Sequence, residues 1–366
     1  MIYYAVFGIL ATLSLLGIAI RGHQLATVGM VAAVIVLFVF GGLRFEVGAD
    51  WEPYREMFLQ SAYRFDFRTF QSEYLYQAAN YVLSSNGIDY VTYIGIAFAV
   101  ALGLKLFGVY RLTPYLGVSL LVYYTTLFTY FDINGIRQGL ALGMSILALK
   151  FVTRGQLAWY VVAAGAAVAI HVSAIIFVPC YWLARAKLSP RTCGLLVIAA
   201  ICARPVLGMI VTNQTLLSVM LSHAELLRFE NYMQDEHYGS GVGLFDLATL
   251  QRLVVLGAFI VAWKRVQMEA SVKNILLNVY AISVIVFIMF SAHQEMAARL
   301  SVYYKAADLI ILPALITAGR GMGQRLAIFL TILAYCAALL FRTMSIPDNY
   351  LTPYNNALTL NWHRGL

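Results

Sequence analysis

Charge is scarce in this sequence, and that scarcity excludes a large class of folds. Only 11% of the 366 residues are charged and 61% are hydrophobic, whereas soluble domains carry about 25% charged residues. A fold surrounded by water could not bury so much apolar surface. The sequence therefore predicts a protein whose main solvent is the lipid bilayer.

Cysteine motifs, basic patches and leader features are also missing. The cysteines lie in apolar runs without metal-ligand spacing, which argues against a disulfide framework or zinc site and predicts small buried residues: Cys180, Cys193, Cys202 and Cys336. The basic residues are scattered between apolar runs, so we expect no nucleic-acid partner. No basic residue precedes the first apolar run, and residues 1–20 are interpreted as a membrane helix rather than a removed signal peptide.

Long apolar runs are what the sequence has in abundance. Most measure about 17 to 22 residues, the length that an α-helix needs to cross roughly 30 Å of hydrocarbon. A membrane β-barrel would show alternation, and these runs do not. We expect an all-α, polytopic membrane protein with about 12 transmembrane or re-entrant helices, over residues 2–20, 25–43, 91–109, 115–131, 135–152, 157–169, 171–184, 193–211, 249–263, 274–291, 297–318 and 326–342.

Acids and bases are separated between alternate connections. Of the 17 acids, 15 fall in one set, and the other set carries mostly lysine and arginine. Basic residues are retained on the cytoplasmic side of a membrane. We therefore expect the acidic set and both termini to be external. Two long external segments, residues 44–90 and 212–248, would form the active-site face of a single transmembrane domain over residues 1–366.

One pair of apolar runs is too short for two full crossings. Residues 157–169 and 171–184 nevertheless join two basic connections that should lie on the same side. We expect two shortened or re-entrant helices that meet near His171, at a turn that protein buries or a cavity contains. Within the first long segment, residues 74–85 are typical of an amphipathic interfacial helix.

The segment after the second apolar run combines a cation, a carboxylate and aromatic rings. Arg44, Asp50, Trp51 and Tyr54 lie close together in the sequence. Aromatic faces stack on sugar rings, carboxylates accept hydrogen bonds from hydroxyl groups, and arginine grips phosphate oxygens with two donors. The mixture therefore suits a sugar phosphate. Ordinary interfacial aromatics and loop ion pairs are the alternative.

Arg137 and Gln138 fall in the first turn of the expected helix over 135–152. A helix N-terminus favours anions, and Arg137 would reinforce that preference. The alternative is that Arg137 pairs with Asp132 as a structural cap.

Three further polar residues lie at expected external ends. His171 is at the expected hairpin tip, where a satisfied core histidine is the alternative. Arg299 begins another helix, and Tyr303 lies one turn below it on the same face.

Short motifs follow one another along nearly the whole chain: Gly42-Leu43-Arg44, Gly48-x-Asp50-Trp51-x-x-Tyr54, Glu73 with Tyr76, Ile136-Arg137-Gln138, His171-x-Ser173, Arg299 with Tyr303, and Pro353-Tyr354. Together they resemble the EpsG-like family of Wzy-type bacterial polysaccharide polymerases. The resemblance implies a fold like that of the membrane glycosyltransferases without a nucleotide-sugar domain, the GT-C-like class. The lack of a nucleotide-binding loop agrees with a polyprenyl donor.

The resemblance also implies a reaction. The enzyme would join undecaprenyl-diphosphate-linked oligosaccharide repeat units, for O-antigen or exopolysaccharide, on the periplasmic or external face of the bacterial inner membrane. An acceptor hydroxyl attacks the anomeric carbon and lipid diphosphate leaves, so the site needs clustered cations and one base. The expected diphosphate ligands are Arg44, Arg137 and Arg299. The expected base is Asp50, with Glu73 and His171 behind it, and the expected sugar or phosphate contacts are Trp51, Tyr54, Gln138 and Tyr303.

Cofactors and partners follow from the same resemblance. We expect no metal or other cofactor, because the arginines supply positive charge; Mg²⁺ or Mn²⁺ between Asp50, Glu52 and the diphosphate is the alternative. The expected partners are the lipid-linked oligosaccharide, membrane lipid, a flippase and a chain-length regulator.

Three other functions stay open. They are a lipid-linked oligosaccharide flippase or transporter, an O-antigen ligase that uses the same donor with a lipid A core acceptor, and a membrane acyltransferase with His171 as base. Transporters often show internal repeats and charges near the bilayer midplane. This sequence shows no repeat and gathers its polar residues at one face, which favours an interfacial enzyme.

Overall fold

The computed structural model describes residues 1–19, 23–63, 73–211, 241–346 and 349–359. Within these ranges the chain is helical, apart from turns, loops and one isolated antiparallel bridge between Arg44 and Asn356. Seven of the described helices are long and apolar enough to cross a membrane, and shorter apolar helices accompany them. The prediction of an all-α, polytopic membrane protein is confirmed.

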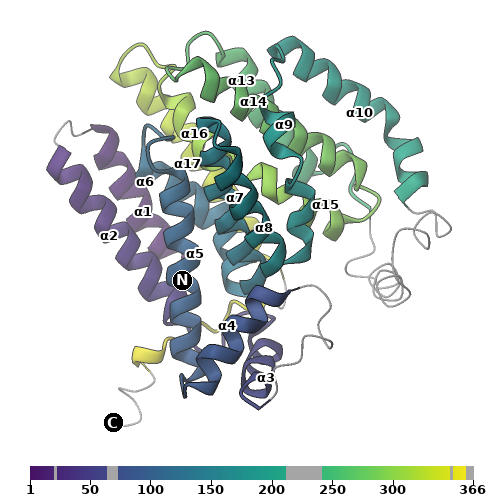
Figure 1. The fold of residues 1–366 in the computed structure, drawn as a ribbon. Coiled ribbons are helices and arrows are strands. Elements are labelled where there is room, and N and C mark those ends of the chain that lie inside the picture. Colours follow the sequence, from purple (N-terminus) through teal and green to yellow (C-terminus); the bar gives the residue numbers. More distant parts are fainter. Residues whose placement is uncertain (20–22, 64–72, 212–240, 347–348, 360–366) are drawn as a thin grey trace. The chain divides into compact units, whose positions relative to one another are not determined.

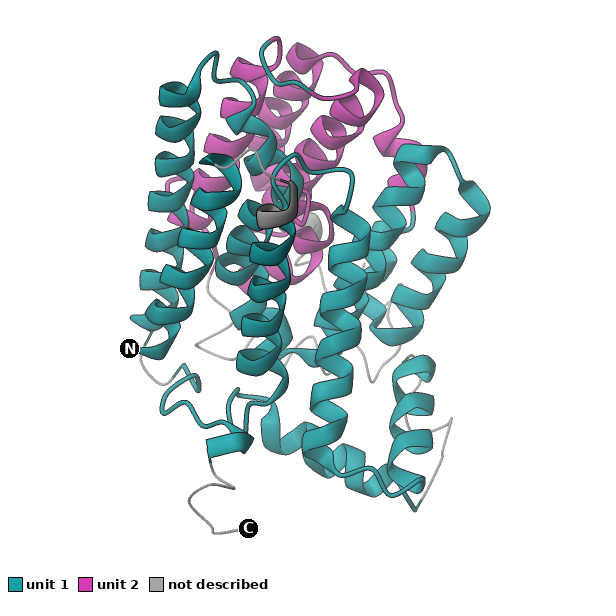
Figure 2. Ribbon diagram, turned by 90° about the vertical axis from the view of Figure 1, so that its left-hand side faces the viewer, with its two compact units in different colours: residues 1–178, 265–267, 308–366 teal, residues 179–264, 268–307 magenta. Residues whose placement is uncertain are grey.

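The described helices form two compact units, coloured separately in Figure 2. The first comprises residues 1–178, 265–267 and 308–366, and the second comprises residues 179–264 and 268–307. The single domain expected over residues 1–366 stays a prediction.

The first unit contains most of the helices labelled in Figure 1. They are α1 (Ile2–Ala19), α2 (His23–Gly42), α3 (Trp51–Ser61), α4 (Tyr74–Ser85), α5 (Tyr90–Val109), α6 (Leu116–Tyr123), η1 (Tyr124–Asn134), α7 (Ile136–Arg154), α8 (Leu157–Ile170), η2 (Val172–Phe177), α16 (Asp308–Ile316) and α17 (Met322–Met344).

Helix α7 lies at the centre of this unit and packs against α5, η1 and α8. Small side chains such as Ala101 of α5, and Ala141 and Ala148 of α7, are buried there. Lipid tails are as apolar as leucine, so membrane helices associate through close packing of small residues rather than through a hydrophobic driving force. This packing fixes the start of α7, where Arg137 lies.

One end of the first unit gathers the ends of several helices. The chain after α17 returns to this end, where the hydroxyl of Tyr3 donates to the carbonyl of Leu351 at 2.8 Å. The ring of Tyr354 stacks on Phe40 near the end of α2, with centroids 4.4 Å apart. Figure 1 shows α3 and α4 at the same end, where α5 begins. These are the ends that the charge pattern predicts on one side of the membrane.

Several boundaries differ from the expected runs. The helix expected over 115–131 begins as α6 and continues as the π-helix η1 to Asn134; π-helices are rare and are often found at functional sites. The run expected over 297–318 is split into α15 (Gln294–Lys305) and α16. The expected interfacial helix over 74–85 is present as α4, and the first long segment also contains α3.

The expected break near His171 is present. This residue is extended, with φ −151° and ψ 122°, and separates α8 from the 3₁₀-helix η2. The hydroxyl of Tyr160 in α8 donates to the carbonyl of Phe177 at 2.5 Å, which ties η2 back to α8. Most of the second expected external segment, residues 212–240, lies outside the described residues.

The second unit contains α9 (Cys180–Ala184), α10 (Pro190–Val211), α13 (Leu247–Ala262), α14 (Ala270–Met289) and α15. Helix α14 packs against the other four. The amide of Asn278 in α14 donates to the carbonyl of Ala184 at 2.9 Å and so joins α14 to the end of α9. A buried polar group in lipid needs such a partner.

Candidate functional site

The loop after α2 is fixed by a glycine. Gly48 has φ +109°, a conformation that side chains disfavour, and a Cβ atom there would lie 2.6 Å from the carbonyl oxygen of Ile133. The next residue, Ala49, donates its amide to Oδ1 of Asn134 at 2.9 Å. These contacts hold the start of α3 against the end of η1. The motif Gly48-x-Asp50-Trp51 therefore has a structural reason for its glycine.

Glu73 is the centre of a three-residue polar cluster. It precedes the first residue of α4, and its side chain is only 10% exposed. One carboxylate oxygen forms an ion pair with Nη1 of Arg137, and the other lies 2.5 Å from Nδ1 of His171. The site thus joins the start of α4, the first turn of α7 and the residue that ends α8. Arg137 and His171 keep side-chain exposures of 26% and 15%, so a ligand can reach them.

The charge of Glu73 is stabilised within this cluster. Burial acts to raise the pKa of Glu73, but the hydrogen bond with His171 and the positive charge of Arg137 outweigh burial and hold the pKa below its usual value. Glu73 therefore stays ionised and is a weak base, and its two oxygens accept hydrogen bonds from their neighbours. A carboxylate in that state suits the orientation of a neighbouring imidazole.

The guanidinium of Arg137 lies over the rings of two tyrosines, Tyr54 and Tyr76. The guanidinium lies 5.1 Å from the ring centroid of Tyr54 and 5.9 Å from that of Tyr76. Its Nε donates to the hydroxyl of Tyr54 at 3.3 Å. Burial raises the pKa of Tyr54 well above its usual value, so this hydroxyl stays neutral. Within the described part of the chain, the hydrogen bonds of the Arg137 guanidinium use Nε and Nη1 and leave Nη2 without a partner.

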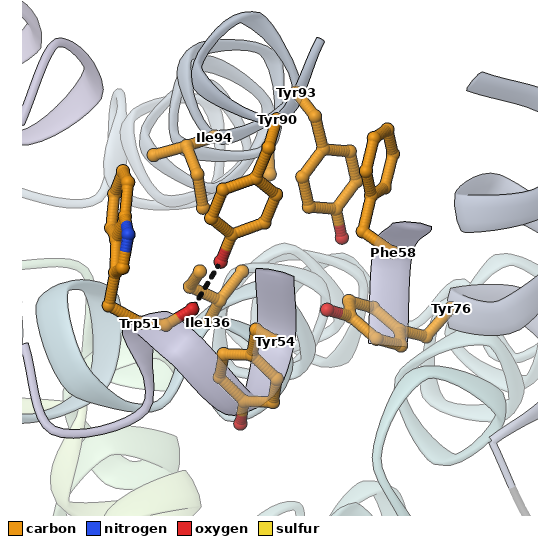
Figure 3. Packing of buried hydrophobic residues seen from close by; sticks show 9 residues of the cluster. Trp51, Tyr54, Phe58, Tyr76, Tyr90, Tyr93, Ile94 and Ile136 are labelled. Carbon is orange, nitrogen blue, oxygen red and sulfur yellow. Dashed lines mark hydrogen bonds between the residues drawn. The ribbon is translucent and has the colours of Figure 1, made fainter. Parts of the chain in front are cut away.

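Tyr54 and Tyr76 belong to a larger cluster of buried aromatic side chains. Figure 3 shows Trp51 and Phe58 of α3 against Tyr90 and Tyr93 of α5, with the hydroxyl of Tyr54 pointing away from them. The ring of Trp51 meets that of Tyr90 edge-on at 5.0 Å, and the Tyr90 hydroxyl donates to the carbonyl of Trp51 at 3.1 Å. Trp51 is only 6% exposed. It packs α3 onto α5 here, and its expected contact with substrate stays a prediction.

The expected alternative for Arg137, a pair with Asp132, is wrong. Asp132 accepts instead from Nζ of Lys105 at 2.6 Å and from the hydroxyl of Tyr123 at 2.8 Å. Lys105 also donates to the carbonyl of Gly139 at 2.9 Å, and a Cβ atom on Gly139 would lie 2.5 Å from Oδ1 of Asp132. The pair is fully buried. Through these bonds Lys105 joins α5 to η1 and α7, and Arg137 forms its ion pair with Glu73 instead of Asp132.

Sequence reasoning missed Lys105 as part of this arrangement. A lysine inside an apolar run is a signal in itself, because an ionisable residue in a membrane helix needs a partner. Asp132 lies between the next two expected runs and is the partner that the structure shows for Lys105.

Arg44 is almost completely buried, at 1% exposure. Its Nη1 donates to the carbonyl of Gly41 at 2.6 Å and its Nη2 to that of Ile133 at 3.3 Å. A cavity of about 10 Å³, roughly the volume that one water needs, is lined by Arg44 and Asp132. Arg44 therefore ties the end of α2 to η1, and its expected contact with diphosphate stays a prediction.

The remaining expected residues fall into two groups. In the first unit, Asp50 is the partly buried N-cap residue of α3, and its negative charge contributes to the raised pKa of Tyr54 one turn further on. Gln138, also in the first unit, is buried next to Arg137 in the sequence. In the second unit, Arg299 pairs with Glu295 one turn away and Tyr303 is buried. The expected roles of these four residues stay predictions.

Within the described ranges, no three residues among histidine, cysteine, aspartate and glutamate lie together as possible ligands of a metal ion. The Glu73 cluster offers an arginine, a carboxylate and an imidazole, and metal independence stays a prediction.

Comparison with known proteins adds one match. A family model described as the EpsG family matches residues 28–356. The match contains Arg44, Asp50, Glu73, Arg137 and His171. No curated protein and no solved structure matches the chain.

Proposed function

The chain belongs to the EpsG family, which supports a role of the polysaccharide polymerase type, and we propose that it joins undecaprenyl-diphosphate-linked oligosaccharide repeat units at the external face of the bacterial inner membrane. The observation that carries this proposal is the Glu73 carboxylate shared between Arg137 and His171 in a partly accessible site. It brings together the cation and the base that such a transfer needs.

His171 is the proposed general base. Its Nδ1 is occupied by Glu73, and within the described chain its Nε2 forms no hydrogen bond. A carboxylate at Nδ1 fixes the tautomer in which Nε2 accepts a proton, and it stabilises the imidazolium that then forms. The acceptor hydroxyl loses its proton to Nε2 as its oxygen forms the new bond to the anomeric carbon. Glu73 orients this base, while Asp50 is the alternative base.

Arg137 is the proposed ligand of the departing lipid diphosphate. The bond from the anomeric carbon to the diphosphate oxygen breaks as the new glycosidic bond forms, so negative charge builds on the leaving group. Nη2 of Arg137 and the backbone amides of the first turn of α7 supply donors for that charge. Arg44 and Arg299 are the further cations proposed for this step, and Tyr54, Tyr303 and Gln138 are proposed to orient sugar or phosphate groups.

The experiment is a reconstituted assay with undecaprenyl-diphosphate repeat units in membranes, with product length read on a gel. Wild type should give a ladder, and Arg137→Ala should lose most of it, since one transition-state donor is commonly worth roughly 10²- to 10³-fold in rate. Arg55→Ala is the matched control, because Arg55, like Arg137, is an ion-paired arginine, but it lies in α3, is exposed and pairs with Glu52. A ladder of normal length from Arg137→Ala would contradict the assignment.

The same assay separates the alternatives. Movement of labelled lipid between leaflets without any ladder would mean a transporter, and transfer to a lipid A core acceptor alone would mean a ligase. Activity that EDTA abolishes and Mg²⁺ or Mn²⁺ restores would overturn the proposed metal independence.

A further inference from the structure

Three cations gather at the opposite end of α5 and α7 from the Glu73 cluster. Lys150 and Arg154 lie in the last turns of α7, and Arg111 follows the end of α5. The charges of Arg154 and Arg111 are close enough to act on Lys150. In the part of the chain that the structure describes, none of the three forms an ion pair with an acid.

Aromatic rings hold two of these cations. Nζ of Lys150 lies 3.4 Å from the ring centroid of Phe107 and donates to its carbonyl at 3.0 Å. The guanidinium of Arg111 lies 5.6 Å from the ring centroid of Tyr110. Lys150 is only 4% exposed. Arg111 and Arg154 are exposed. Like charges that lie close together repel, and an anion placed among them would relieve that repulsion.

An apolar groove adjoins the same two aromatic residues. It has a volume of about 380 Å³, within the range of roughly 300 to 1,000 Å³ found for ligand pockets. No charged residue lines it; among its walls are Val31, Ile35, Gly103, Leu106, Phe107 and Tyr110. Its apolar lining therefore suits a hydrocarbon chain, and Lys150 and Arg111 contact two residues of its wall, Phe107 and Tyr110.

We propose that the groove and the cations bind one anionic phospholipid, with an acyl chain between α2 and α5 and the phosphate at Arg111 and Lys150. A neutral lipid would use the groove but leave the cations unneutralised. A helix of 20 residues spans about 30 Å, so a head group at Arg111 belongs to the leaflet opposite the Glu73 cluster. The ligand is thus a lipid of that second leaflet rather than the sugar donor, and the proposal does not depend on the reaction.

The test uses the full chain in detergent, with native mass spectrometry and thermal unfolding against phosphatidylglycerol and phosphatidylcholine. Phosphatidylglycerol should bind more tightly and raise the melting temperature. Arg111→Gln and Lys150→Met should each weaken its binding about fivefold, since a basic residue near anionic lipid contributes about 1 kcal/mol. Lys187→Gln, at an exposed lysine of the second unit, should change nothing.

A second variant tests the groove without removing charge. Gly103 lines the groove, and a Cβ atom there meets no atom within 4 Å, so Gly103→Phe fills the space without a clash at its base. It should weaken phosphatidylglycerol binding, whereas Gly165→Phe, at another glycine with open space, should not. Equal binding of both lipids, unchanged preference in Arg111→Gln, or displacement of phosphatidylglycerol by undecaprenyl diphosphate at equal concentration would overturn the proposal.

Discussion

Glu73 and His171 lie 98 residues apart in the sequence and are joined by a hydrogen bond of 2.5 Å between Oε1 and Nδ1. The bond holds the start of α4 against the end of α8, two helices that also pack on each other. Because Arg137 occupies the other carboxylate oxygen, one side chain sets the positions of both a cation and an imidazole. The geometry of the candidate site therefore depends on Glu73 more than on any of its partners.

Glu73→Gln should lower polymer synthesis by roughly 10²-fold, the lower range of general acid–base contributions. A glutamine amide has one oxygen and one NH₂ group, so it can accept from either Arg137 or His171 but presents a donor to the other. The variant nearly preserves the side-chain volume, and protein abundance should change little. Initial rates in the reconstituted assay measure the effect.

The control for this variant is Glu52→Gln. Glu52 is also ion-paired to an arginine, but it is exposed on α3 and pairs with Arg55 within one turn. Such surface pairs contribute little. Equal losses in the two variants would remove Glu73 from the site.

The lowered pKa of Glu73 predicts an acid-sensitive contribution to stability. Because the folded-state pKa lies below the ordinary value of about 4.5, the ionised carboxylate stabilises the fold fully above that value. The contribution is lost as the pH falls through the lowered pKa. The melting temperature of wild type should therefore fall more steeply than that of Glu73→Gln between about pH 5 and pH 3. Parallel curves for the two proteins would show that Glu73 is not stabilised as an anion.

The Lys105–Asp132 pair should be costly to break on one side. Lys105→Met leaves Asp132 buried without its cation, a change that commonly destabilises by about 3 to 5 kcal/mol. Adding Asp132→Asn removes the unpaired charge, so the double variant should unfold at a higher temperature than Lys105→Met alone. Lys264→Met, at an exposed lysine, is the control. Additive losses in the double variant would contradict a coupled pair.

The helices were predictable from sequence because hydrocarbon thickness sets their length. The expected run over 91–109 differs from α5 by one residue, and the break at His171 followed from runs too short to cross. The π-helical form of η1 was not predictable, since its residues are as apolar as those of an α-helix. Asp132, near the end of η1, is held by hydrogen bonds from Lys105 and Tyr123, contacts that the hydropathy of the run does not indicate.

The candidate site was predictable in its residue types but not in its pairing. Arg137 and His171 were expected from their positions at helix ends, and Glu73 was expected because of the family resemblance. The three residues lie far apart in the sequence, so the sequence does not indicate that the Glu73 carboxylate binds both Arg137 and His171. The burial of Arg44 was equally hidden, because a motif shows that an arginine is needed but not whether it faces a ligand or backbone carbonyls.

Gly48 should tolerate alanine less well than Gly87, although both have positive φ angles of 109° and 77°. A left-handed conformation costs an L-residue roughly 1 to 2 kcal/mol, and this cost applies to both. At Gly87 a Cβ atom meets no atom within 4 Å, whereas at Gly48 it lies 2.6 Å from the carbonyl oxygen of Ile133. Gly48→Ala must therefore also push the loop away from η1, which moves Asp50 and the start of α3. We expect Gly48→Ala to lose both polymer synthesis and stability, and Gly87→Ala to lose stability only. The reconstituted assay measures synthesis, and thermal unfolding measures stability. Full synthesis by Gly48→Ala would show that the loop does not position the site.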